Sequence, residues 1–200
     1  MGNEKDRHGG MSKRLQALIR KEFTSLKDDF VALLIVDAEK FAETNIELVK
    51  ILKHENKLPG VYITGNVPYK NLKEHFDSHK VDLKDLTFID MVTQMSGEEA
   101  QKEENCVFVD SPDSLTELSV TLDKAMDKIK GREKFLILDS VSTLLIYNKD
   151  RAVEKFTHFL ANNLRENPGT KGILLAVQTN ENKNALEMLA QFCDKVVKLV

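Results

Sequence analysis

The feature that most constrains this chain is the alternation of short, uniformly apolar runs with amphipathic segments. Val31–Val36 is a continuous apolar run, and the segment 41–53 after it carries Ile46, Val49 and Leu52 on one stripe. A strand that is apolar at every position is typical of a parallel sheet, which is buried on both faces. An apolar stripe at intervals of three and four residues indicates a helix that packs on such a sheet.

The same alternation continues along the rest of the chain. Further strands are expected at 61–64, 86–90, 135–139, 172–177 and 195–200, with a shorter extended stretch at 105–110. Further helices are expected at 69–77, 114–130, 150–165 and 183–192. This order predicts a three-layer α/β domain, with a mostly parallel sheet and helices on both of its faces.

The chain divides into three parts by composition. Residues 1–10 are polar and are expected to be flexible, residues 11–27 form an amphipathic helix, and residues 28–200 form the α/β domain. The apolar stripe of the first helix includes Leu15, Leu18 and Ile19. This stripe could pack on its own domain or on a neighbouring subunit, and the sequence leaves both arrangements open.

Composition excludes several classes of protein. The net charge is −3, so no global basic signature for nucleic acid is present, and no apolar run approaches the ~20 residues that span a bilayer. The first ten residues lack the apolar core of a secretory signal. Cys106 and Cys193 lie far apart without metal-ligand spacing, so we expect free thiols, no metal site and a cytoplasmic protein.

The segment Asp37–Thr44 stands between the first strand and its helix, where a phosphate-binding loop would be expected. Such a Walker A loop reads G-x-x-x-x-G-K-[ST], with glycines for close backbone approach and a lysine as countercharge. This chain keeps the eight-residue length and Thr44, but Asp37 and Ala42 replace the glycines and Glu43 replaces the lysine. A triphosphate would therefore meet a like charge at the lysine position.

Several later segments occur in an order that resembles the RecA/KaiC/RadA-like P-loop ATPases, above all small archaeal KaiC-like members. The segment 136–145 reads like a Walker B strand and the start of its next element, with 61–64 and Pro68 upstream and 173–178 downstream. Residues 109–119 are similar to the segment that precedes Walker B in that family. The resemblance implies a RecA-like domain in which the strands ending near Asp37 and Asp139 flank the strand that ends at Gln178.

The resemblance also implies three catalytic requirements. A glycine-rich loop with its lysine is degenerate here, and the acidic residue expected after the second strand is replaced by Gly65 and Asn66, neither of which is a general base. The Walker B carboxylate that orders Mg²⁺ is matched by Asp139, followed by Ser140. A structural role for Asp139, capping a neighbouring turn, is the other interpretation.

These residues form a vestigial nucleotide site without a catalytic residue or cofactor: Asp37, Ala42, Glu43, Thr44, Gly65, Asn66, Asp139, Ser140 and Gln178. The first hypothesis is a catalytically inactive module that regulates or assembles with a protein partner or with copies of itself. The second is a nucleotide-binding ATPase or sensor that uses ATP and Mg²⁺ through a non-standard loop. The third is a DNA-associated, recombinase-like accessory factor; no membrane partner is expected.

Overall fold

The computed structural model describes residues 13, 16–22, 29–97, 103–131 and 133–199. Within these residues, seven strands form one sheet in the order β4-β3-β2-β5-β6-β1-β7, and every neighbouring pair is parallel. The strands are β1 (Phe30–Val36), β2 (Gly60–Thr64), β3 (Leu86–Asp90), β4 (Cys106–Phe108), β5 (Lys134–Asp139), β6 (Thr170–Val177) and β7 (Lys195–Leu199). The three-layer α/β fold is confirmed, and β1 and β5 flank β6 as the resemblance implied.

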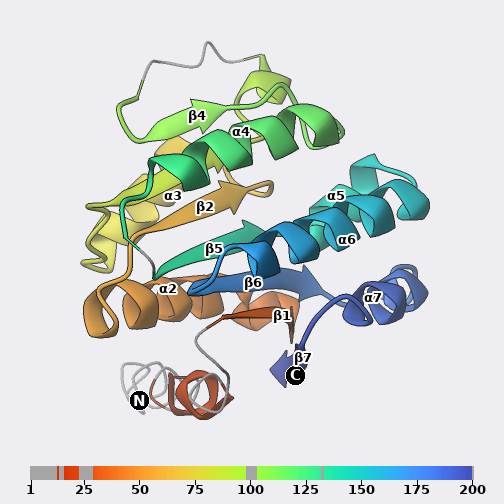
Figure 1. Ribbon diagram of the computed structural model, residues 1–200, viewed down its shortest axis with the longest axis horizontal. Helices are drawn as coiled ribbons and strands as arrows, with labels where there is room; N and C mark the ends of the chain where they lie inside the picture. Colours follow the sequence, from red (N-terminus) through yellow and green to blue (C-terminus); the bar gives the residue numbers. More distant parts are fainter. Residues whose placement is uncertain (1–12, 14–15, 23–28, 98–102, 132, 200) are drawn as a thin grey trace, which may run out of the picture.

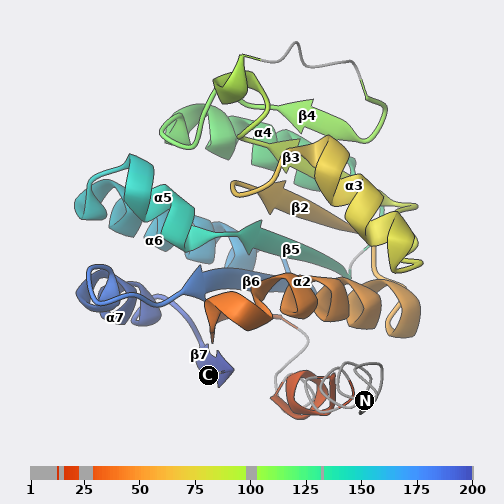
Figure 2. The same ribbon diagram turned by 180° about the vertical axis from the view of Figure 1, so that it is seen from behind.

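Helices cover both faces of this sheet (Figures 1 and 2). They are α2 (Phe41–Lys50), α3 (Tyr69–Ser78), α4 (Leu115–Lys128), α5 (Val141–Tyr147), α6 (Asp150–Glu166) and α7 (Lys183–Ala190). Short 3₁₀ turns occupy Ala38–Lys40 and Gln94–Ser96, and α2 continues as a π-helical turn, Ile51–Glu55. In Figure 2 the helices α2 and α3 lie nearest the viewer, whereas α4 and α6 lie on the opposite face.

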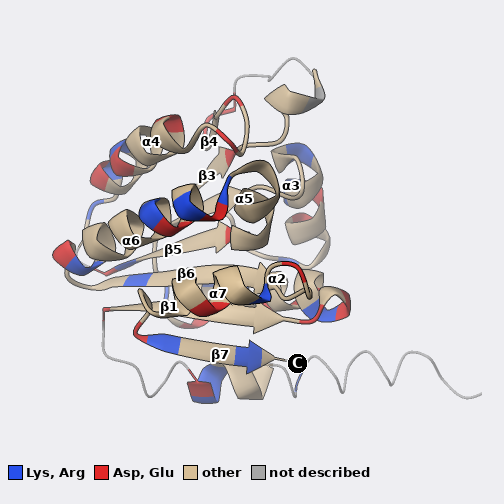
Figure 3. Cartoon of the chain, turned by 90° about the vertical axis from the view of Figure 1, so that its right-hand side faces the viewer, with Lys and Arg blue, Asp and Glu red and all other residues tan. Residues whose placement is uncertain are grey.

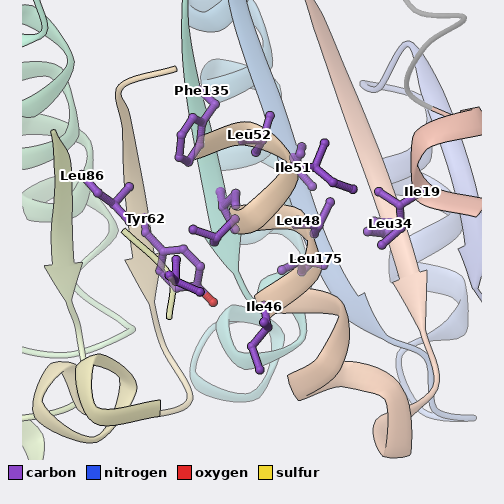
Figure 4. Close-up of a cluster of buried hydrophobic side chains, with 14 of the residues drawn as sticks. Ile19, Leu34, Ile46, Leu48, Ile51, Leu52, Tyr62, Leu86, Phe135 and Leu175 are labelled. Carbon is purple, nitrogen blue, oxygen red and sulfur yellow. The ribbon is translucent and has the colours of Figure 1, made fainter. Parts of the chain in front are cut away.

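The five inner strands, β1, β2, β3, β5 and β6, contribute alternate side chains to two separate apolar layers. On β1, Ala32 and Leu34 pack with α2 and α3, whereas Leu33 and Ile35 pack with α4, α6 and α7. Figure 4 shows the first layer, in which Tyr62 and Phe135 from the sheet meet the side chains of α2. Because side chains alternate along a strand, Asp139 points to the same face as Phe135. That parity places its carboxylate on the α2 side of the sheet.

The N-terminal helix packs on its own domain within the part described. Residues 16–22 are helical, and Ile19 is fully buried against the layer that contains Leu34 and Leu48 (Figure 4). Arg20 forms an ion pair with Glu55, and Lys195 Nζ lies 3.0 Å from Glu22 Oε2. Packing in cis, one of the two open arrangements, therefore holds for these residues. The segment 1–10, which the sequence predicts to be flexible, and Leu15 lie outside the described residues.

Two elements differ from the sequence expectation. The helix α5 was not predicted, because it is only 7 residues long and follows the apolar strand β5 almost directly. The N-cap signal was present in Ser140, whose Oγ accepts a hydrogen bond from the backbone N–H of Thr143. The expected extension at 105–110 is shorter, since only Cys106–Phe108 pairs with β3.

Candidate functional site

The predicted site residues follow β1, β2, β5 and β6, and these strands end at one edge of the sheet. Thr64 pairs with Asp139, and Val36 pairs with Val177, so the four strands reach this edge in register. Ligands of open α/β sheets usually bind beyond the carboxyl ends of the strands, at a point where the strand order reverses. The geometry beyond this edge therefore decides what the site can do.

Asp139 is the centre of a buried hydrogen-bond cluster at the end of β5. Its Oδ2 accepts from the Tyr62 hydroxyl at 2.6 Å and from Asn45 Nδ2 at 3.0 Å, and its Oδ1 accepts from Asn66 Nδ2 at 2.6 Å. These three donors come from β2, α2 and the turn after β2. The carboxylate at the end of β5 thus connects to α2 and to β2 with its following turn, which lie far from it in the sequence. Its partners are side chains, rather than the turn amides that the structural interpretation anticipated.

Burial perturbs the acid–base properties of this cluster. Asp139 is only 2% exposed, and desolvation raises the pKa of its carboxyl from 3.8 to about 6. The hydrogen bonds from Tyr62, Asn66 and Asn45 oppose this rise, because they favour the charged form. The pKa of Tyr62 is raised well above its usual value, first by burial and then by the Asp139 charge. Tyr62 therefore stays a hydrogen-bond donor around neutral pH.

A second set of hydrogen bonds connects this cluster to the start of α5. The peptide bond between Asp139 and Ser140 is cis. Ser140 Oγ lies 3.1 Å from Thr143 Oγ1 and 3.3 Å from Asn66 Nδ2. The Thr143 hydroxyl also donates to Asn66 Oδ1. Asn66, at the general-base position of the family, is thus held between the Asp139 carboxylate and α5 by both ends of its amide.

The segment Asp37–Thr44 is a compact turn rather than an open loop. Lys40 N donates to Asp37 O at 3.0 Å, and Phe41 N donates to Ala38 O, so a 3₁₀ turn leads directly into α2. Lys40 Nζ also lies 2.9 Å from Asp37 Oδ2. A phosphate-binding nest needs backbone N–H groups that converge on the ligand. Here the N–H groups of Lys40 and Phe41 are used within the turn.

The remaining residues of this segment lie on the first turn of α2. Thr44 is fully buried, and its hydroxyl donates to Lys40 O at 2.8 Å instead of facing the edge of the sheet. Ala42 is exposed and Glu43 is half-buried. In this conformation Thr44 is not positioned to offer its hydroxyl to a metal ion, which the sequence had left possible.

Gly65 and Gln178 complete the predicted set in different ways. Gly65 N donates to Asp139 O at 2.5 Å, and a Cβ at Gly65 would lie 2.9 Å from Met91 Cε and 3.3 Å from that same carbonyl oxygen. Glycine therefore permits a close approach between two strand ends. Gln178 is exposed and comes after β6, apart from the hydrogen bonds of the Asp139 cluster.

A cleft of about 670 Å³ opens beside these residues at the same edge. Asn66, Ser140 and Thr143 line one part of it, and apolar side chains that include Phe41 and Ile146 line another. Among the described residues that line the cleft, Asp150 and Glu181 are charged and none is Lys, Arg or His. The cleft can therefore offer hydrogen bonds and negative charge, but no side-chain countercharge for a phosphate.

Sequence reasoning missed three members of the cluster: Asn45, Tyr62 and Thr143. Tyr62 and Asn45 lie inside a strand and a helix whose apolar patterns indicated core positions. A polar side chain at a predicted core position indicates a buried hydrogen bond, because buried polar groups are nearly always hydrogen-bonded. That signal was available for Tyr62 and Asn45. Their common partner depends on the strand order, which places β2 beside β5.

A second buried carboxylate at this edge has a structural role. Asp90, at the end of β3, accepts from the backbone N–H groups of Tyr69, Val92 and Thr93 at 2.7–2.9 Å, and from the Thr93 hydroxyl at 2.6 Å. The bond to Tyr69 satisfies an N–H group in the first turn of α3. Asp90 therefore anchors α3 and the turn after β3.

Metal and membrane sites find no support in the described part of the chain. No group of three or more His, Cys, Asp or Glu side chains there could hold a metal ion. His75 and His79 share one helix face, with ring centroids 4.7 Å apart. None of the described helices has the length and apolar character needed to span a membrane.

Comparison with solved structures defines the class of fold. The chain is similar to an uncharacterized protein, PH0321, from Pyrococcus horikoshii, solved in complex with an unknown peptide. The TM-score is 0.68 and the identity 14%, over 90% of this chain and 81% of that one. It is also similar to the KaiC-like protein PH0186 from Pyrococcus horikoshii OT3. There the TM-score is 0.57 and the identity 16%, over 84% of this chain and 71% of that one. The fold is RecA/KaiC-like.

Sequence comparison then gives the family. Residues 33–199 match the model of the Family of unknown function (DUF7504), and the chain belongs to that family. No curated protein matches the sequence. The matched range contains the cluster around Asp139 and the segment Asp37–Thr44.

Proposed function

We propose that this protein is a catalytically inactive member of the RecA/KaiC-like fold class that works without a nucleotide, as a regulatory or assembly module for a protein partner. The observation that carries the proposal is the conformation of the segment Asp37–Thr44, where a phosphate-binding loop would be expected. There a closed turn holds an ion pair between Lys40 and Asp37, and Glu43 occupies the lysine position. A degenerate Walker A segment of this kind offers a triphosphate neither converging amides nor a countercharge.

The hydrogen bonds of Asp139 support the same proposal. In the ATPase family the matching carboxylate orders Mg²⁺ and its water ligands, but here both carboxylate oxygens accept from protein side chains. A single carboxylate seldom holds Mg²⁺ without substrate phosphates. We infer that the role of Asp139 is its contacts with Tyr62, Asn45 and Asn66, which stabilise this edge of the sheet.

The nature of the partner is inferred from charge and from a relative. Lys and Arg are interspersed with Asp and Glu on α4 and α6 (Figure 3), so these helices present no continuous basic face for DNA. PH0321 was solved in complex with an unknown peptide, which supports peptide binding as a role for this fold. The partner is accordingly a protein or a second copy of the chain.

The test measures mass by light scattering, for the chain alone and mixed with candidate RecA-like ATPases, with and without Mg²⁺ and ATP. We expect an assembly, homomeric or with a partner, whose mass does not change when nucleotide is omitted. Phosphate release from ATP by the chain alone should equal that of buffer. Hydrolysis by the chain that Asp139→Ala abolishes, or assembly that requires ATP binding to this chain, contradicts the proposal.

A further inference from the structure

The cleft at the carboxyl edge has an apolar wall in which one large side chain, Ile146, is open to solvent and the others are partly buried. Phe41, Leu145, Ile146 and Val177 contribute to it, and Ile146 is 77% exposed although it is a large hydrophobic side chain. Isolated apolar side chains on a surface need no explanation. Here Ile146 borders a cleft of about 670 Å³, next to the half-exposed Tyr147. A macromolecular partner that fills the cleft would also cover the exposed side chain of Ile146 on its border.

The charges of the same cleft have one sign. Asp150, at the first position of α6, and Glu181, before α7, are exposed carboxylates on its lining. A hydrogen bond from Thr179 lowers the pKa of Glu181, which keeps that carboxylate charged at neutral pH. Lys149 and Arg151 flank Asp150 in the sequence and Lys183 follows Asn182, but none of these cations is on the lining, and Lys40 is paired with Asp37. Phosphate groups would be repelled by these carboxylates, and cationic side chains would be attracted.

We propose that this cleft binds a peptide segment of a partner protein in which Lys or Arg alternates with apolar residues. The cation would lie near Asp150 and Glu181, and an adjacent apolar side chain would cover Ile146. Asn66, Ser140 and Thr143 lie on the same lining, but their polar groups are used in hydrogen bonds to Asp139 and to one another, so the peptide would be held mainly by its charged and apolar side chains. The inference rests on the proposed function, because it names the chemistry of the partner and places it where a nucleotide would otherwise lie.

The test uses fluorescence anisotropy with short, fluorescein-labelled peptides and no nucleotide. One peptide alternates leucine with arginine, and two controls replace every arginine with glutamate or with glutamine. We expect binding of the arginine peptide only. The double variant Asp150→Asn, Glu181→Gln should weaken it by roughly threefold to thirtyfold, because exposed ion pairs are individually weak. Ile146→Ser should weaken it by about tenfold or more through lost apolar contact.

Glu187→Gln provides the matched control, because Glu187 is an exposed carboxylate on α7 outside the cleft. It should leave the affinity unchanged. Equal binding of the glutamate peptide, no effect of the double variant, or no binding of the arginine peptide overturns the inference. Adding ATP with Mg²⁺ distinguishes failure of the inference from failure of the proposed function. If ATP displaces the peptide, the proposed function fails; if neither ligand binds, only the peptide inference fails.

Discussion

The hydrogen bond between Tyr62 and Asp139 can be removed with little change in packing by Tyr62→Phe. The ring of Tyr62 is fully buried, with centroids 5.7 Å from Phe76 and 5.8 Å from Phe88, and phenylalanine keeps these contacts. The substitution deletes only the hydroxyl that donates to Asp139 Oδ2 at 2.6 Å. The loss in free energy of unfolding caused by Tyr62→Phe therefore measures the contribution of one hydrogen bond to a buried carboxylate.

The cost should depend on pH, and its sign is set by the pKa of Asp139. Burial raises that pKa from 3.8 to about 6, so the folded chain binds the proton more tightly than the unfolded chain. The contribution of Asp139 to the free energy of unfolding is therefore largest below its unfolded pKa of 3.8, and it falls as the pH rises through its folded pKa of about 6. The Tyr62 hydrogen bond lowers the pKa, so Tyr62→Phe raises it further. The variant thus loses most stability where Asp139 is charged.

The expected magnitude depends on the charge of the acceptor. A hydrogen bond to a charged group contributes about 1.5–3 kcal/mol, whereas a neutral one contributes about 0.5–1.5 kcal/mol. Urea unfolding, followed by circular dichroism at about pH 8 and about pH 4.5, measures the difference. We expect Tyr62→Phe to lower the free energy of unfolding by about 1.5–3 kcal/mol at about pH 8, where Asp139 is charged. At about pH 4.5, where Asp139 is neutral, we expect a loss of about 0.5–1.5 kcal/mol.

Tyr69→Phe is the matched control for this measurement. Tyr69 is also a buried tyrosine, and its ring packs on Phe88 with centroids 5.0 Å apart, but its hydroxyl donates to the neutral amide oxygen of Asn105 at 2.6 Å. Its destabilisation should be about 0.5–1.5 kcal/mol at both pH values. A cost of Tyr62→Phe that is the same at both pH values would refute the view that Tyr62 stabilises a buried charge.

Two further substitutions test the packing of the N-terminal helix and of the strand ends. Ile19→Ala should destabilise the chain by about 2–5 kcal/mol, because Ile19 is fully buried. Leu18→Ala on the same helix should cost far less, because Leu18 is 38% exposed. Equal losses of stability for the two variants in thermal unfolding would contradict packing of this helix in cis. Gly65→Ala should cost about 1 kcal/mol in urea unfolding, because its Cβ would lie 3.3 Å from the Asp139 carbonyl oxygen as well as 2.9 Å from the methyl group of Met91; an unchanged midpoint would show that both neighbours yield without loss.

The sequence predicted the layers of the fold well because the apolar patterns are local. Strands such as β3 and helices such as α6 were found within one or two residues of their observed bounds, since each presents its own apolar run or stripe. Helix α5 was missed because it is only 7 residues long and begins almost directly after the apolar strand β5. Its signal was the capping geometry of Ser140 and Thr143, which a search for apolar periodicity does not detect.

The candidate site was predicted in location but not in its contacts. Asp139, Asn66 and Ser140 were named because they come after strands, and the parallel sheet brings them together. Asn45 and Tyr62 were not named, because their role requires knowing which face of β5 carries Asp139 and which strand lies beside it. The closed turn at Lys40 could not be foreseen either, since an ion pair with Asp37 does not follow from residue type alone.

The central claim is that the phosphate site at Asp37–Thr44 no longer binds a nucleotide, and thermal unfolding with excess Mg²⁺ and ATP tests it most directly. Binding at 100 times the dissociation constant would stabilise the folded chain by about 2.7 kcal/mol. For a domain of this size that corresponds to a rise in melting temperature of roughly 5–10 °C. The account predicts no ATP-dependent shift. A shift of this size that Asp139→Ala removes would contradict it.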